Sequence, residues 1–387
     1  MGKFIENRRN LSKIVLAFDS FKGSLTSIRA AEAAAKAIHA VLPDCKIATV
    51  QIADGGEGTV DAICAGSGLK STRIECNVHD PLMRAISTYY EILSDGTAII
   101  ETASASGLTL LSPDERNPML TTTFGTGEQI LDALNRGCRK FLIGLGGSAT
   151  NDAAMGILAA LGYRFVDASG HELAPTGENL AKAEKIVTIN ADNRLTECSF
   201  TLACDVESPF CGNLGAARIF APQKGATMEQ VDMLDNGLRH FAKLLKATFH
   251  TNMTATAGAG AAGGIGGTLC AALGARLCRG IDIVLDYADF DNAIADADLI
   301  LTGEGSIDEQ SGMGKAISGI LSRANRQRVP VVALAGCVNG VEKLNEQGLK
   351  ATFSIQQRPI SLNDAINAKT AAKGIYSVTT QILKLLI

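Results

Sequence analysis

The residues of this chain that could do chemistry lie in short segments where glycine, serine or threonine stands beside a carboxylate or a lysine. Most of these segments follow an apolar run of the kind expected for a buried strand. They are residues 19–24, 53–59, 101–107, 121–128, 144–152, 222–226 and 303–308. Glycine-rich turns that lead into helices present free N–H groups, which bind anions. Carboxylates beside such turns suit Mg²⁺, and lysines neutralise a transferring phosphoryl group. One such segment alone is an ordinary turn, but the whole set indicates phosphoryl transfer.

Two large classes of phosphoryl-transfer protein are excluded because the sequence lacks the motifs that define them. A Walker A loop needs Gly, four residues and then Gly-Lys-Ser/Thr, whereas Gly314-Lys315 is followed by Ala316 and the first position is Glu309. The His-Arg-Asp and Asp-Phe-Gly signatures of protein kinases do not occur in the sequence.

Two further glycine motifs point to other classes of protein. The segment 258–263 fits Gly-x-Gly-x-x-Gly, and Asp282 follows 19 residues later, but residues 251–257 lack the apolar strand that a dinucleotide site requires. A dehydrogenase for small hydroxy acids therefore remains a weaker alternative. The segment 144–149 resembles the phosphate loop of the galactokinase and homoserine kinase superfamily, although the β-loop-α-β opening of the chain argues against that superfamily.

The elements that must position these loops are alternating strands and helices at both ends of the chain. An apolar strand is expected at 13–18, a helix to about residue 41 and a strand at 46–52, which is the opening of a parallel sheet. The same alternation is expected in the C-terminal part, with strands at 297–302, 329–335 and 351–355 and helices at about 315–325 and 366–386. The middle is less regular, with strands near 86–93, 97–101 and 139–145 and helices over 126–136 and 152–162.

The fold class expected from this pattern is α/β, with two α/β domains. One is a discontinuous, doubly wound domain, residues 1–75 plus 285–387, with a mainly parallel, Rossmann- or flavodoxin-like sheet. The other is an inserted α/β domain, residues 76–284, with a mixed sheet.

Composition limits the partners and the compartment. With 387 residues, 46% of them hydrophobic, and a net charge of −4, the chain is neither disordered nor a favoured nucleic-acid binder. Ten scattered cysteines without a Cys-x-x-Cys pair fit a reducing cytoplasm. Residues 247–275 carry no charge, but their glycines favour a loop feeding a buried helix over a membrane span.

The motifs together resemble those of the bacterial type 1 glycerate kinases, also called glycerate 2-kinases, from residue 13 to about residue 385. The resemblance rests on the segments 19–25, 53–59, 101–108, 123–128, 144–152, 204–206, 222–226, 258–264 and 302–305. It implies ATP-dependent phosphorylation of D-glycerate, with Mg²⁺, to give 2-phosphoglycerate. It also implies that the active site lies in the cleft between the two domains.

Four departures from the family pattern affect substrate fit or rate rather than the fold. Phe18 replaces a proline, the pair Ala153-Ala154 replaces two glycines, and Ser306 stands where a basic residue is common. The segment 207–210 reads Glu-Ser-Pro-Phe, where the family has Asp-Asn-Pro-Leu. The alanine pair adds two methyl groups where the backbone is expected to approach a ligand.

Roles follow from the loop chemistry and the resemblance together. Lys22 is expected to contact phosphate, and the catalytic carboxylates are expected among Asp19, Asp54 and Asp205. Residues expected to bind the substrate or a phosphate are Ser20, Ser24, Gly55, Gly56, Glu57, Ser148, Asn151, Asp152 and Lys224. Residues expected to bind the nucleotide are Gly303, Glu304, Gly305, Asp308 and Lys315. The metal candidates are Asp54 and Asp308, while His79 and His240 are expected to be structural.

The expected partners are ATP and D-glycerate, with no nucleic acid and no membrane; a homodimer is left open. Alternatives within the kinase class are another small hydroxy acid as the substrate, or 3-phosphoglycerate as the product. A catalytically inactive sugar-acid sensor is the alternative outside it.

Overall fold

The computed structural model of the protein describes residues 11–52, 63–64, 68–307 and 316–387. The chain divides into two compact units. Unit 1 comprises Met1–Gly68 and Gly280–Ile387, and unit 2 comprises Leu69–Arg279.

Unit 1 contains a parallel sheet of five described strands. The strands are β1 (Lys13–Phe18), β2 (Lys46–Thr49), β11 (Leu299–Ile307), β12 (Val331–Val338) and β13 (Ala351–Ser354). They lie in the order β13-β12-β11-β1-β2, and every pairing is parallel. Counted along the described strands of this unit, the order is 2-1-3-4-5, that of flavodoxin-like folds. Its switch point lies between β1 and β11, where such sheets bind their ligands at the carboxyl edge.

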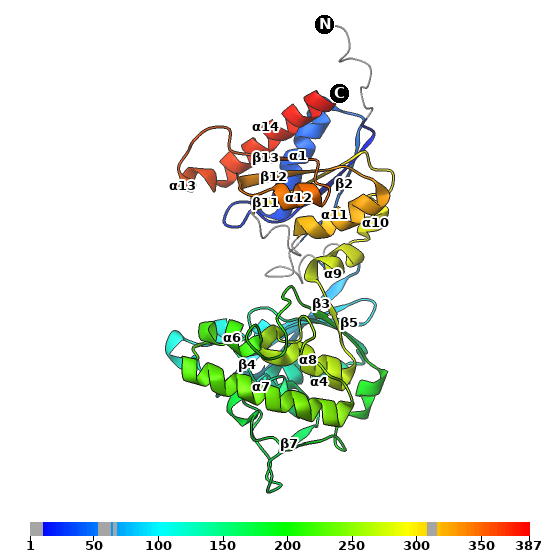
Figure 1. Ribbon diagram of the computed structural model, residues 1–387. Helices are drawn as coiled ribbons and strands as arrows, with labels where there is room; N and C mark the ends of the chain where they lie inside the picture. The colour runs from blue at the N-terminus through cyan, green and yellow to red at the C-terminus, as the bar shows by residue number, and fades with distance from the viewer. Residues whose placement is uncertain (1–10, 53–62, 65–67, 308–315) are drawn as a thin grey trace. The chain divides into compact units, whose positions relative to one another are not determined.

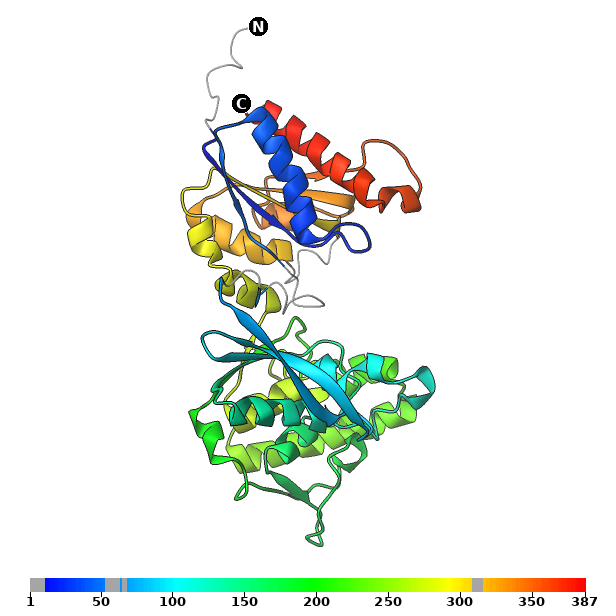
Figure 2. The same cartoon turned by 180° about the vertical axis from the view of Figure 1, so that it is seen from behind.

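Helices cover both faces of this sheet. The pair α1 (Ser27–Val41) and α14 (Ala368–Leu386) packs side by side on one face, where Ile14 and Leu16 of β1 join their core (Figures 1 and 2). The alternate residues Val15 and Ala17 face a second core. The helices on that side are α9 (Gly280–Tyr287), α10 (Phe290–Ala293), α11 (Ala316–Gln327) and α12 (Glu342–Glu346), while α13 (Leu362–Ala365) precedes α14. The doubly wound parallel domain predicted from the sequence is therefore confirmed.

Unit 2 is built on a mixed sheet. Its strands are β3 (Ser71–His79), β4 (Ala85–Leu93), β5 (Thr97–Glu101), β6 (Lys140–Gly144), β9 (Ser199–Ala203) and β10 (Arg276–Cys278). They lie in the order β10-β9-β6-β5-β4-β3. The pairs from β10 to β5 are parallel, and β4 pairs antiparallel with both β3 and β5, as expected for a mixed sheet. A separate antiparallel pair joins β7 (Arg164–Val166) to β8 (Lys185–Val187).

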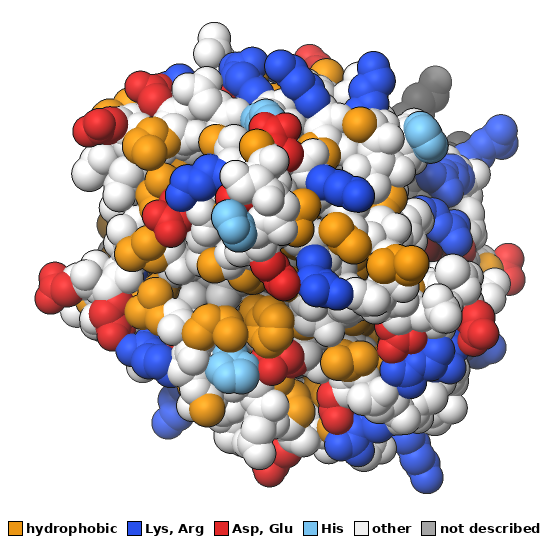
Figure 3. Space-filling model, turned by 90° about the horizontal axis from the view of Figure 1, so that it is seen from below, with side chains coloured by type: hydrophobic (Ala, Val, Ile, Leu, Met, Phe, Trp, Pro, Cys, Tyr) orange, Lys and Arg blue, Asp and Glu red, His pale blue; other side chains and the backbone are white. Residues whose placement is uncertain are grey.

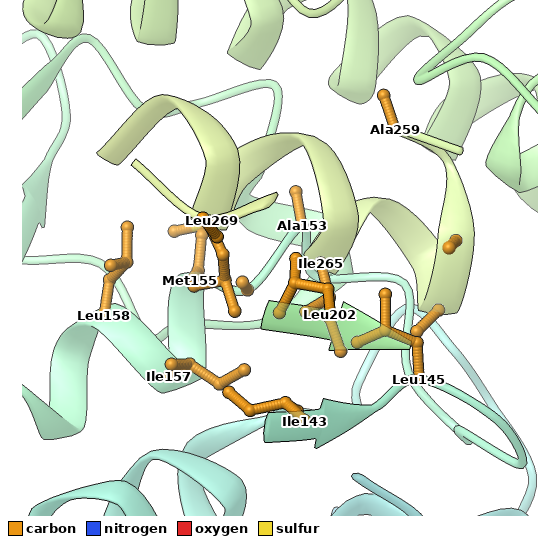
Figure 4. Close-up of a cluster of buried hydrophobic side chains, with 14 of the residues drawn as sticks. Ile143, Leu145, Ala153, Met155, Ile157, Leu158, Leu202, Ala259, Ile265 and Leu269 are labelled. Atoms are coloured by element: carbon orange, nitrogen blue, oxygen red, sulfur yellow. The ribbon is translucent and has the colours of Figure 1, made fainter. Parts of the chain in front are cut away.

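The helices of unit 2 are α3 (Thr102–Ser106), α4 (Phe124–Asn135), α5 (Met155–Ala160), α6 (Ala216–Phe220), α7 (Met228–Phe249) and α8 (Ala261–Leu273). Short 3₁₀ turns lie at Leu108–Leu110, Pro113–Glu115, Gly177–Asn179, Asn193–Glu197 and Pro222–Lys224. Figure 4 shows how Ile143 of β6 and Leu202 of β9 gather with Ile265 and Leu269 of α8 in the buried core.

Several sequence-based boundaries differ from the structure. The glycine-rich segment from residue 303 was expected to be a loop, but β11 continues to Ile307 because Ser306 and Ile307 still pair with β12. Strand β3 and the long helix α7 were not predicted, since their apolar residues are interleaved with charged ones. The short strand β9 was also missed, although its five residues include no charged one. The uncharged stretch 247–275 contains α8, as expected, and no described helix is long and apolar enough to cross a bilayer.

The surface of unit 2 visible in Figure 3 carries Lys and Arg interspersed with Asp and Glu. Apolar side chains gather near the middle of this face, and no patch of a single charge covers it. This distribution gives a nucleic acid no basic surface on the face shown.

Candidate functional site

At the carboxyl edge of the unit 1 sheet, two of the predicted loops meet. Phe18 is paired in register with Gly303, and the Asp19 N–H donates to the Gly303 carbonyl at 2.9 Å. Asp19 is buried, and its Oδ1 accepts the Ser20 N–H at 2.6 Å. Glu304 follows on β11 and is half-buried. This junction is the switch point of the sheet, so it brings a catalytic and a nucleotide-binding candidate together.

Lys22 is displayed by a tight loop at the same edge. Phe21 and Leu25 close the loop with two backbone hydrogen bonds of 2.8 and 3.0 Å, and Gly23 supplies the left-handed turn at φ +76°. Lys22 is exposed, whereas Ser24 Oγ is buried without a hydrogen-bond partner among the described residues. A Cβ on Gly305 would lie 3.4 Å from the backbone nitrogen of Lys22, so the Lys22 loop lies against the glycine-rich end of β11.

Six predicted site residues fall on segments without a described structure. Asp54, Gly55, Gly56, Glu57, Asp308 and Lys315 lie outside the described residues. Both metal candidates are among them, and the part of the chain that is described contains no group of three or more potential metal ligands.

In unit 2, the loops after β5 and β6 meet at another carboxyl edge. Gly144 is in register with both Glu101 and Ala203, so loops of neighbouring strands start side by side. Ser148 forms an isolated bridge with Gly107, and the Ala149 N–H donates to the Ser106 carbonyl at 2.8 Å. These contacts position the segment 148–152 between α3 and α4.

Lys224 is the buried cation of this region. Its ammonium group donates to Ser148 Oγ at 2.9 Å and to the Thr150 carbonyl at 2.7 Å, and the residue is only 2% exposed. Burial lowers the pKa of Lys224 to about 7, against an opposing effect from the Asp152 carboxylate. The structure thus brings together three predicted substrate-binding residues: Lys224, Ser148 and Asp152.

Asp152 is completely buried at the starts of α4 and α5. Its Oδ2 accepts the Thr123 N–H at 2.7 Å, the Thr123 hydroxyl at 2.8 Å and the Gly156 N–H at 3.1 Å. Burial is the main cause that raises the pKa of this carboxyl group, while these hydrogen bonds oppose it. Thr123 was not among the predicted site residues, although its place in the Thr-Phe-Gly-Thr-Gly motif was a signal that could have found it.

A glycine-rich turn forms one wall of the cluster. Ala262, Gly263 and Gly264 at the start of α8 all have positive φ values. A Cβ on Gly263 would lie 2.2 Å from the Thr150 carbonyl oxygen, and the Gly263 carbonyl accepts the Ala153 N–H at 3.1 Å. The motif 258–263, considered above as a dinucleotide loop, instead lets another loop approach its backbone closely.

Ala153 and Ala154, whose methyl groups the sequence analysis expected where the backbone approaches a ligand, lie in the core of unit 2. Both residues are completely buried in the apolar core of unit 2, and Figure 4 shows Ala153 beside Ile265. Both have left-handed backbones, with φ values of 49° and 58°, which explains why glycine suits these positions. Their place in the core could not be inferred from the sequence, and the expectation of a ligand near them stays a prediction.

The remaining polar candidates of unit 2 are more dispersed. Asp205 is exposed at the carboxyl end of β9. His79 Nδ1 lies 2.9 Å from Glu128, and His240 Nε2 lies 2.7 Å from the Ala183 carbonyl, so both rings have structural partners. An open pocket of about 540 Å³ includes Thr122, Phe124 and Tyr163 in its walls but none of the predicted site residues.

Both units are α/β structures whose loops at the carboxyl edges suit anionic ligands: Lys22 and backbone turns in unit 1, and the buried Lys224 in unit 2. The fold and these sites place the protein in the class of α/β proteins that bind phosphate- or carboxylate-bearing molecules.

A model of the glycerate kinase family matches residues 14–387, and the chain therefore belongs to the glycerate kinase family. It is 42% identical to a glycerate kinase of Bacillus cereus, over 95% of this chain and 97% of that protein. It is 41% identical to the glycerate 2-kinase of Escherichia coli K12, over 91% and 93% of the two chains. It also resembles the crystal structure of a Salmonella typhimurium LT2 protein provisionally named glycerate kinase 2. That match has a TM-score of 0.84 and 39% identity, and it covers 97% of this chain and 98% of the other.

Proposed function

We propose that this protein transfers the γ-phosphoryl group of ATP to the 2-hydroxyl group of D-glycerate, giving 2-phosphoglycerate. Membership of the glycerate kinase family supports the reaction class, and the relative named glycerate 2-kinase supports the position of transfer. The structural observation that carries the proposal is the buried ammonium group of Lys224, held by Ser148 and the Thr150 carbonyl. A hydroxy acid needs a cationic or N–H-rich site for its carboxylate, and this cluster supplies one.

Unit 1 supplies the groups for the transferring phosphate. Lys22 is exposed on a hydrogen-bonded turn beside Gly305, and its ammonium group stabilises negative charge that develops on the phosphoryl oxygens. Gly303, Glu304 and Gly305 lie at the switch point, where doubly wound sheets bind nucleotides. Asp19 is the described catalytic candidate, with its carboxylate at the same edge.

The donor set of unit 1 fits Mg²⁺. This ion is usually held by one or two carboxylates together with substrate phosphates, and Asp19 and Glu304 supply oxygens on neighbouring strands. Asp54 and Asp308 remain proposed ligands on segments without a described structure. When bound with ATP, the ion supplies positive charge that neutralises the β- and γ-phosphates.

The test is to incubate the protein with Mg-ATP and D-glycerate and to resolve the products by phosphorus NMR. The expected product is 2-phosphoglycerate, formed only when all three components are present. Formation of 3-phosphoglycerate would overturn the proposed position of transfer. Binding of glycerate without turnover would favour the sensor alternative, and turnover of another hydroxy acid alone would overturn the substrate.

A further inference from the structure

Three consecutive buried residues in unit 2 carry polar atoms that lack partners. Thr150 Oγ1, both side-chain polar atoms of Asn151, and Asp152 Oδ1 make no hydrogen bond within the described part of the chain. All three residues are 0% exposed. Leaving a buried polar group unpaired costs about 1–3 kcal/mol, so folded proteins seldom keep several together. The arrangement indicates that a ligand or bound water pairs with these atoms.

The unpaired atoms belong to the segment that Lys224 holds. The lysine ammonium group carries three donors, and its two described acceptors are Ser148 Oγ and the Thr150 carbonyl. On the other side, a Cβ on Gly263 would lie 2.7 Å from the Asn151 Cα, so the backbone has no room to retreat in that direction. Asn151 thus follows the residue whose carbonyl binds Lys224, and its backbone packs tightly against the turn at Gly263.

The unpaired donors and acceptors indicate which chemical groups a ligand would carry. The Lys224 ammonium is a donor, which suits a carboxylate, and the Asn151 amide nitrogen can donate to a hydroxyl oxygen. Asn151 Oδ1 and Asp152 Oδ1 are acceptors, which suit a hydroxyl group. A small molecule carrying both groups on adjacent or next-adjacent carbons matches the cluster, whereas inorganic phosphate lacks the separate alcohol group.

We propose that Asn151 is a specificity-determining residue. It binds the unreactive hydroxyl group of the hydroxy acid, the one to which no phosphoryl group is transferred. This inference rests on the proposed function, because transfer to the 2-hydroxyl leaves the 3-hydroxyl as the group to be recognised. Entry of the ligand requires the segment between Gly146 and Thr150 to move. At its outer end, Gly146 and Gly147 are exposed, and Gly147 has a φ of +71°.

The proposal is tested by comparing D-glycerate with D-lactate, which lacks only the 3-hydroxyl group. Dissociation constants are measured by calorimetry for the wild-type protein and for Asn151→Ala. The wild-type protein is expected to bind D-glycerate about tenfold or more tightly than D-lactate, because a site built to bind a hydroxyl group rejects an analogue without it. In Asn151→Ala this preference is expected to fall to near unity, with the affinity for D-lactate little changed.

Three results would overturn the inference. One is a wild-type protein that binds both acids equally, a result that needs no variant. Another is an Asn151→Ala protein that keeps the full preference, as expected if the unpaired atoms only hold water. The third is an equal loss of affinity for both acids, which would indicate a structural role.

If Asn151→Ala does not fold, Asn151→Ser provides the same comparison with a smaller loss of polarity. The outcome stays separate from that of the proposed function. A protein that phosphorylates D-glycerate without the hydroxyl preference disproves only the role of Asn151, whereas absence of any phosphorylation disproves the kinase.

Discussion

The ammonium group of Lys224 lies 2.9 Å from the hydroxyl oxygen of Ser148, although the two residues are 76 positions apart in the chain. The lysine ends the 3₁₀ turn Pro222–Lys224 after α6, and the serine lies in the loop after β6. Neither segment alone is more than a turn with a polar residue. Their contact creates a buried, positively charged site beside Asn151 and Asp152.

Removing the charge of Lys224 should weaken glycerate binding. A hydrogen bond to a charged group contributes about 1.5–3 kcal/mol, so Lys224→Met should raise the KM for D-glycerate by about 10- to 100-fold. The KM for ATP should change much less. Steady-state kinetics with each substrate varied in turn measures both values.

The matched control is Lys243→Met, which removes an exposed lysine from α7 in the same unit. Its kinetics should equal those of the wild-type protein. Equal effects of the two substitutions would show that Lys224 does not contact the substrate.

Glycerate binding should weaken as the pH rises through about 7. Burial lowers the pKa of Lys224 to about 7, although the Asp152 carboxylate opposes this shift, so the ammonium form that binds a carboxylate is lost above this pH. Calorimetric titrations between pH 6 and pH 9 should show a falling affinity for D-glycerate in the wild-type protein. Lys224→Met should show a flat profile, and a wild-type profile without slope would contradict the proposal.

The same lysine should make the protein more stable at higher pH. Its folded-state pKa lies below the unfolded value of 10.5, so between about pH 7 and pH 10 the unfolded chain binds more protons. The free energy of unfolding should therefore rise across this window, and below pH 7 the full destabilisation should remain. Urea titrations of the wild-type protein and Lys224→Met, with the difference plotted against pH, isolate this contribution.

Lys22→Ala should lower kcat rather than stability. Removing one preorganised group that stabilises transition-state charge commonly costs 10²- to 10³-fold in kcat, and an exposed lysine contributes little to folding. Turnover with saturating ATP and glycerate measures the first effect, and the melting temperature measures the second. Lys36→Ala, on the exposed face of α1, is the control expected to leave both unchanged.

The two ends of α8 provide a matched pair of glycine substitutions. A Cβ at Gly263 would lie 2.2 Å from the Thr150 carbonyl, whereas one at Gly274 would meet nothing within 4 Å; both residues have positive φ. Gly274→Ala should cost about 1 kcal/mol from its backbone alone. Gly263→Ala should cost about 3 kcal/mol or more, because a backbone collision is added.

Gly263→Ala should also impair glycerate binding, because the Thr150 carbonyl that it displaces is an acceptor for Lys224. The free energy of unfolding in urea and the KM for D-glycerate are measured for both variants. If Gly274→Ala were as harmful as Gly263→Ala in either measurement, close packing at the Thr150 carbonyl would not be the cause.

Much of the fold could be predicted because local patterns report local structure. The run of apolar residues at Lys13–Phe18 predicted a buried strand, and the spacing of apolar residues after it predicted α1. Strand β3 was missed because its apolar residues alternate with charged ones over only a few positions, and most of its side chains are exposed or half-buried. The extension of β11 through its glycines was missed because pairing with β12, rather than local preference, maintains the strand.

The sequence by itself determined the family, the α/β class and most of the loops that carry polar groups, since each of these is a property of consecutive residues. The tertiary structure alone decided that Lys224 is buried, that the Asn151 side chain has no hydrogen-bond partner among the described residues and that the methyl group of Ala153 faces the core. Burial and hydrogen bonding depend on which distant segments pack together. The charge, pKa and availability of a side chain therefore follow from those contacts, and no local pattern encodes them.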